Sequence, residues 1–135
     1  YIKALKDNNI SFDKNLLVQG DYLQEGAYYF FKNYFRKNKD FTAIFCANDS
    51  AAIGVYDVLK ENNCKIPNDY SVIGVDDKPL YKYITPKLTT VSQPLLEIGE
   101  TAGEKFIQLL NNKIKGPIQL ELPFTLVEKE SVRKI

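Results

Sequence analysis

The chain has 135 residues, of which 44% are hydrophobic, and its formal net charge is +1. This length supports one hydrophobic core, and the balanced charge argues against nucleic-acid binding by this piece itself. Its apolar runs are far shorter than the roughly 20 residues of a membrane-spanning helix, so we expect no membrane partner.

Helices and strands alternate along the first half of the chain. Residues 1–6 are typical of the middle of an amphipathic helix, so we expect the chain to be a piece of a longer protein. Residues 16–19 (LLVQ) and 42–47 (TAIFCA) predict two short buried strands, and apolar residues at helical spacing predict a helix over 24–38. This order is a βαβ unit.

The pattern continues through a second helix and a third strand. Asp49 is expected to cap the next helix, which ends at Asn62. Residues 71–75 (SVIGV) predict another buried strand. Strands alternating with helices at this spacing predict an α/β fold, with a parallel sheet flanked by helices and joined by right-handed crossovers.

Polar residues follow each of the three predicted strands. They include Tyr22 after the first strand, Asn48 after the second and Asp76 after the third. The carboxyl ends of parallel strands meet at one edge of a sheet, so these residues should cluster there. Asn48 offers an acceptor and two donors, an ionised Asp76 only accepts, and the Tyr22 ring offers an apolar plane. The set suits a sugar or similar polar ring, although the same three residues would also serve a strand end, a turn and the core.

Enzymatic chemistry has little support in this chain. It has no histidine, which excludes Ser-His-Asp and Cys-His sites, and no glycine-rich phosphate loop. Asp49, Asp76 and Asp77 together would suit a magnesium ion for phosphoryl transfer, but Asp49 already has a role as a cap. We expect no catalysis, no metal and no cofactor. Cys46 and Cys64 are interpreted as small structural residues in a reducing cytosol.

Four segments resemble a known family when they are taken in order. They are 47–54 (ANDSAAIG), 66–77 (IPNDYSVIGVDD), 86–94 (PKLTTVSQP) and 126–131 (LVEKES). This ordered set resembles regulators of the lactose and galactose repressor family. The resemblance implies one lobe of an effector-binding domain with the periplasmic-binding-protein-like (type I) fold, in which two α/β lobes enclose a ligand cleft. A separate amino-terminal helix-turn-helix domain binds operator DNA in that family.

The resemblance also implies a division of the chain. Residues 1–94 and 117–135 would form the C-terminal lobe, with a last strand over about 117–127, and 95–116 would be a crossover helix that packs on the first lobe. That lobe is expected to lie outside this piece. The helix carries one apolar stripe, formed by Leu95, Ile98, Ala102, Phe106, Leu109 and Leu110. Burial of such a stripe is favourable, so we expect the helix to dock on its own lobe or on a second copy.

The site residues follow from the resemblance position by position. Asn48 and Asp76 match positions that commonly contact the effector, Tyr22 matches an aromatic residue that stacks on it, and Gln93 is a weaker candidate. An effector-contacting arginine commonly lies just before the position of Tyr1, so this piece alone should bind effector weakly.

The neighbours of the site residues and the subunit interface are implied in the same way. Asp49 and Asp77 match structural groups beside the ligand contacts. Ile53 and Ile84 lie in regions that form much of the dimer interface in the family, although both residues would also serve as core and loop contacts.

The combined interpretation is a cytoplasmic, ligand-sensing lobe of a DNA-binding transcriptional regulator that is not an enzyme. Its partners would be a small polar effector, such as a sugar or sugar derivative, a second copy of the chain, and operator DNA through the separate domain. A sugar-binding protein that feeds a transporter is the alternative, and a magnesium-dependent phosphoryl-transfer enzyme is a distant one.

Overall fold

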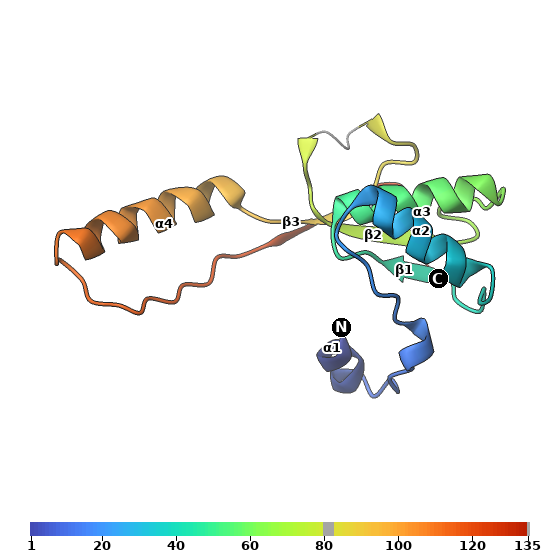
Figure 1. Ribbon diagram of the computed structural model, residues 1–135, viewed down its shortest axis with the longest axis horizontal. Coiled ribbons are helices and arrows are strands. Elements are labelled where there is room, and N and C mark those ends of the chain that lie inside the picture. Colours follow the sequence, from blue (N-terminus) through green and yellow to red (C-terminus); the bar gives the residue numbers. More distant parts are fainter. Residues whose placement is uncertain (80–82, 135) are drawn as a thin grey trace.

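The computed structural model describes residues 1–79 and 83–134, and it contains a four-stranded sheet (Figure 1). The strands lie in the order β1 (Ala43–Phe45), β2 (Ser71–Asp76), β3 (Thr89–Ser92) and β4 (Thr125–Val127). The first three strands are parallel, whereas β4 runs antiparallel to β3. The predicted α/β fold is confirmed, but the sheet is mixed, and the last strand is much shorter than 117–127.

The strand register brings the ends of β2 and β3 together. Val75 lies opposite Val91, and Asp76 lies opposite Ser92. The last residues of both strands therefore reach the same edge of the sheet, and α3 (Asp49–Glu61) begins shortly after β1 ends. This edge is where the sequence predicts a ligand site.

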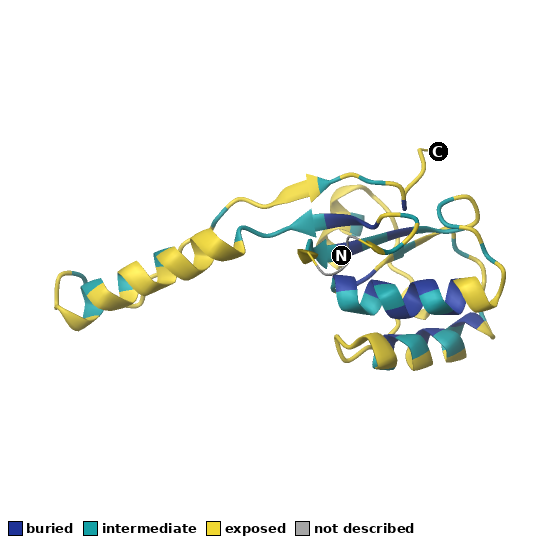
Figure 2. Ribbon diagram, turned by 90° about the horizontal axis from the view of Figure 1, so that it is seen from above, coloured by how far each residue is buried: buried dark blue, intermediate teal, exposed yellow. Residues whose placement is uncertain are grey.

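The core lies between the sheet and two helices. Helix α2 (Gln24–Phe35) packs on α3, and α3 packs on β2. Figure 2 shows the buried residues concentrated in α3 and in the strands beside it. The core residues are Phe31, Phe35, Cys46, Ala52, Val55, Tyr56, Val58, Leu59, Val72 and Leu88. Both helices thus present their apolar stripes to the same core.

The two helices approach so closely that a glycine is required between them. A Cβ atom at Gly54 of α3 would lie 2.3 Å from the Gln24 carbonyl oxygen and 2.7 Å from the Tyr28 backbone nitrogen. Both atoms belong to the backbone of α2, which cannot move aside as a flexible side chain would. The absence of a side chain at Gly54 therefore sets the distance between α2 and α3.

The predicted strand over 16–19 is wrong. The chain instead forms α1 (Ile2–Asp7) and a short 3₁₀-helix, η1 (Lys14–Leu16). The Asp13 carboxylate caps η1 by accepting a hydrogen bond from the Asn15 backbone nitrogen at 2.8 Å. Leu17 follows in an extended conformation, exposed and outside the sheet. β1 is consequently the first strand of the sheet.

Helix α4 (Leu95–Leu110) begins after Pro94, as predicted, but it contains no buried residue. Figure 1 shows it projecting away from the sheet, and Figure 2 shows it mostly exposed, with a few half-buried residues. The expectation that it docks on its own lobe is therefore wrong. Its most exposed large apolar side chains are Leu95, Leu96, Phe106, Ile107 and Leu110. Within the described residues, no helix combines the length and apolar character needed to cross a bilayer.

Replacing Gly54 by alanine should destabilise the protein because the new methyl group would overlap the α2 backbone. We expect G54A to lower the free energy of unfolding by about 1–3 kcal/mol in urea titrations. G99A is the matched control, since a Cβ there meets nothing within 4 Å and alanine favours a helix. Equal stability of G54A and the wild type would contradict this close packing.

Candidate functional site

A buried carboxylate organises the edge of the sheet. Asp49, the first residue of α3, is only 1% exposed. Its Oδ1 accepts a hydrogen bond from the Thr90 hydroxyl at 2.6 Å, and its Oδ2 accepts one from the Lys78 backbone nitrogen at 3.3 Å. Burial raises the pKa of this carboxyl, while these two hydrogen bonds oppose the rise. Asp49 thereby joins α3, β3 and the segment after β2.

The Asp49 side chain occupies space that is left by the absence of a side chain at Gly74. A Cβ atom at Gly74 in β2 would lie 2.3 Å from Asp49 Oδ1 and 2.9 Å from Leu88 Cδ2. In the sheet register Gly74 is opposite Thr90, whose hydroxyl binds the same carboxylate oxygen. Gly74 therefore leaves the space for the Asp49 side chain, and Thr90 supplies its hydrogen-bond donor.

Asn48, rather than Asp49, caps α3. Its Oδ1 accepts a hydrogen bond from the Ala51 backbone nitrogen at 2.8 Å, so the predicted cap at Asp49 is wrong by one residue. The Asn48 Nδ2 donates to the Tyr22 carbonyl oxygen at 2.9 Å. This contact brings the Tyr22 segment to the edge even though no strand precedes it. Tyr22 as a whole residue is 66% exposed.

The two aspartates at the end of β2, Asp76 within the strand and Asp77 directly after it, have different partners. Asp76 Oδ1 accepts a hydrogen bond from Gln93 Nε2 at 3.0 Å, and its Oδ2 lies 3.4 Å from Lys78 Nζ. Asp77 Oδ1 accepts a hydrogen bond from Lys129 Nζ at 2.8 Å, which ties it to the segment after β4. Asp76 is thus the carboxylate at the end of β2 and β3, whereas Asp77 serves as a structural tie.

The backbone at this edge adopts unusual conformations. Tyr22, Asp76 and Asp77 have positive φ angles of 64°, 117° and 56°. Residues other than glycine rarely adopt such angles, and they often occur at ligand-binding and switch sites, where surrounding contacts hold them. Here the contacts are those of Asn48, Gln93 and Lys129.

The structure brings Asn48, Asp76, Gln93 and the backbone of Tyr22 to one edge of the sheet. Asn48 binds Tyr22, the adjacent Asp49 binds the Lys78 backbone, and the Lys78 side chain lies beside Asp76. Sequence reasoning missed the roles of Thr90 and Lys78. The signal for Thr90 is a threonine opposite a glycine in neighbouring strands, which is visible only once the register is known.

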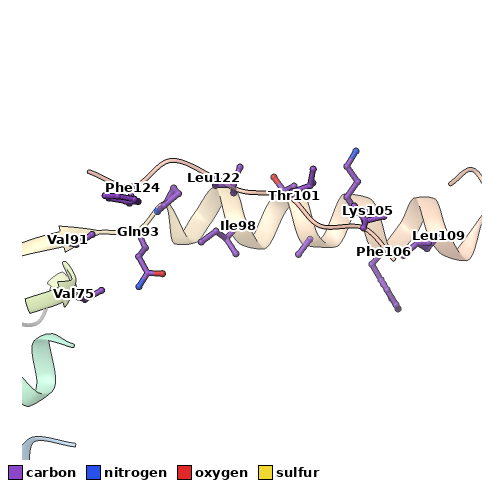
Figure 3. A pocket seen from close by; sticks show the side chains of 14 residues that line it. Val75, Val91, Gln93, Ile98, Thr101, Lys105, Phe106, Leu109, Leu122 and Phe124 are labelled. Carbon is purple, nitrogen blue, oxygen red and sulfur yellow. The ribbon is translucent and has the colours of Figure 1, made fainter. Parts of the chain in front are cut away.

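A largely apolar hollow lies next to this edge, between the ends of β2 and β3 and helix α4. It encloses about 750 Å³. Figure 3 shows Gln93 projecting from the junction of β3 and α4 near Val75, while Ile98 and Phe106 come from α4. Phe124 lines the hollow from the segment before β4. Gln93 therefore belongs both to the polar edge and to this hollow.

The remaining predicted residues are two isoleucines and two cysteines. Ile53 on α3 and Ile84 are half-buried, and Ile84 packs against the core. Cys46 is buried, and burial raises the pKa of its thiol to about 12, so the thiol is protonated at neutral pH. Cys64 is half-buried, and both cysteines are free. Their structural interpretation agrees with this geometry.

A family model described as a periplasmic binding protein-like domain matches residues 1–132. The chain belongs to this family. Its relatives include the HTH-type transcriptional regulator RegA of Clostridium saccharobutylicum, which is 34% identical over 97% of this chain and 40% of its own length. The chain thus spans about two fifths of that relative.

Solved structures give the same result. A LacI family transcriptional regulator from Enterococcus faecium with bound ribose has a TM-score of 0.85 and 31% identity, over 96% of this chain and 48% of its own. Another from Arthrobacter sp. FB24 in complex with lactose has a TM-score of 0.84 and 28% identity, over 97% and 49%. The resemblance to the lactose and galactose repressor family is confirmed.

Removing the Thr90 hydroxyl should destabilise the protein by leaving the buried Asp49 carboxylate short of a donor. We expect T90V to lose about 1.5–3 kcal/mol of unfolding free energy at pH 7, the range for hydrogen bonds to charged groups. T125V, at an exposed threonine of β4, is the matched control and should change little.

The T90V effect should depend on pH with a defined sign. The pKa of Asp49 is raised above 3.8 in the folded protein, so ionisation costs stability as pH rises through the folded pKa. T90V removes a contact that lowers this pKa, so its penalty should be largest at pH 7 and shrink toward pH 4. Urea titrations at both pH values test this, and a penalty that grows on acidification would contradict it.

Proposed function

We propose that this chain is the effector-sensing lobe of a cytoplasmic, DNA-binding transcriptional regulator, and that its effector is a small polar molecule such as a sugar or sugar derivative. The observation that carries the proposal is the meeting of Asn48, Asp76 and Gln93 at one edge of the sheet, held from beneath by Asp49. The proposed contact set is these three residues and the exposed ring of Tyr22.

The chemistry of the edge supports recognition rather than reaction. Asp76 supplies an ionised acceptor, Gln93 supplies an amide, and the Tyr22 ring supplies a flat apolar surface. The other two carboxylates are engaged within the chain, Asp49 with Thr90 and Asp77 with Lys129. The proposed role is therefore binding without catalysis, metal or cofactor.

The exposed helix α4 supports the proposed division of the chain. In this proposal, 1–94 and 117–135 form one lobe, and 95–116 crosses over to pack on a first lobe carried by the longer protein. The apolar hollow between α4 and the strand ends would lie at the junction of the lobes. A ligand bound between them would favour one relative orientation, and a helix-turn-helix domain would convert that shift into altered affinity for operator DNA.

The regulator is favoured over the sugar-binding component of a transporter, which shares the fold. The matched relatives and structures are transcriptional regulators, two of them solved with ribose or lactose bound. We extend this binding class to the present chain as part of the proposal.

Replacing Asp76 by asparagine in the two-lobe protein should weaken sugar binding about 10- to 100-fold, because an ionised acceptor is lost. The measurement is calorimetry with D-ribose, lactose and cellobiose. D77N is the matched control, since the neighbouring carboxylate pairs with Lys129, and it should retain affinity within about twofold. Failure of all three sugars to bind the wild type, or equal losses in the two variants, would contradict the proposal.

The protein is further proposed to form a homodimer through regions that include Ile53 and Ile84, both only half-buried in one chain. A charged side chain at either position would be desolvated in such an interface. The double variant I53D/I84D should therefore sediment as a monomer while the wild type sediments as a dimer. Because both residues also contact their own chain, circular dichroism must first show that the variant is folded. A folded variant that remains dimeric would exclude this interface.

A further inference from the structure

Lys78 stands at the edge of the sheet without belonging to the predicted site. Its backbone nitrogen donates to the buried Asp49 carboxylate, so the position of the residue is fixed from below. Its side chain is 49% exposed, and its Nζ lies 3.4 Å from Asp76 Oδ2. A fixed backbone with an exposed, flexible ammonium group suits a residue that contacts a ligand.

The pairing of Lys78 with Asp76 differs from the ion pair beside it. Asp77 and Lys129 form a 2.8 Å hydrogen bond, and both side chains are about 30% exposed or less. The Lys78–Asp76 separation of 3.4 Å exceeds the usual length of a charge-assisted hydrogen bond. Asp76 Oδ1 already accepts a hydrogen bond from Gln93. The atoms that remain for a ligand are therefore Asp76 Oδ2 and Lys78 Nζ.

The geometry points to Lys78 as a specificity-determining residue that, together with Asp76, recognises a vicinal diol of an uncharged sugar. One hydroxyl would donate to Asp76 Oδ2, and the neighbouring hydroxyl would accept from Lys78 Nζ. This inference rests on the proposed function, since it names the chemical group that the same site selects. A carboxylate and an ammonium side by side match the donor and acceptor capacities of two adjacent hydroxyls.

The charge balance favours a neutral ligand over an anionic one. Lys78 and Asp76 cancel each other, as do Lys129 and Asp77, while Asp49 lies buried close behind them. An added phosphate or carboxylate would meet Asp76 and Asp49 with only one exposed ammonium group in its favour. A diol keeps the ion pair and adds a hydrogen bond to each member.

The test uses the two-lobe protein and calorimetry. The strongest binder among D-ribose, lactose and cellobiose is compared with its monodeoxy derivatives in the wild type and in K78M. K32M is the matched control, because Lys32 forms an ion pair with Glu61 at the far end of α3. We expect K78M to weaken binding at least 10-fold and K32M to leave it unchanged. K78Q repeats the test, and thermal unfolding confirms that the variants are folded.

The deoxy derivatives separate contact from structure. Removing the hydroxyl that Lys78 binds should weaken binding about 10-fold in the wild type and about twofold or less in K78M. Unchanged affinity in K78M and K78Q, or the same loss for every derivative, would overturn the inference while leaving the proposed function standing. Tighter binding of ribose 5-phosphate than of ribose, lost in K78M, would assign Lys78 to an anion and overturn the diol. No binding of any sugar to the wild type would instead overturn the proposed function.

Discussion

The edge of the sheet depends on the burial of one carboxylate. Asp49 is withdrawn from solvent at the start of α3, and a buried carboxylate is tolerated only where donors replace its water. Thr90 and the Lys78 backbone supply those donors, and Gly74 leaves the space that the side chain occupies. Because the donors come from β3 and from the segment after β2, satisfying Asp49 fixes three parts of the fold relative to one another.

The candidate site is a consequence of that constraint. Asn48 is the residue before Asp49, and Asp76 lies two residues before Lys78, so fixing the buried group also fixes the polar groups above it. The positive φ angles of Asp76 and Asp77 are held by bonds to Gln93 and Lys129. The base of the site is therefore held by several contacts, whereas α4 contains no buried residue. In the proposed function, where α4 joins a second lobe, this arrangement suits a sensor whose lobes change orientation.

The sequence was sufficient to predict which residues lie at the carboxyl ends of the strands. It was not sufficient where the structure depends on which strands pair with each other. The rule for carboxyl ends of parallel strands placed Asn48 and Asp76 correctly at one edge, whereas Gln93 was suggested only by the family resemblance. The cap of α3 was predicted at Asp49 but is Asn48, because asparagine and aspartate are both favourable N-cap residues. The sequence does not show that Asp49 is the buried residue of the two. Residues 16–19 have a strand-like composition, but a strand also needs a neighbouring strand to pair with. The antiparallel direction of β4 could not be predicted either, because no local sequence pattern marks it. Lys78 was missed because an exposed loop lysine has no periodic pattern to mark it.

The proposed function requires that the ligand bind at the edge held by Asp49. A crystal structure of the two-lobe protein with its sugar tests it most directly. We expect sugar hydroxyls within hydrogen-bond distance of Asp76 and Asn48, with the hydrogen bond between Asp49 and Thr90 intact beneath them. A sugar bound elsewhere, with this edge facing open solvent, would contradict it.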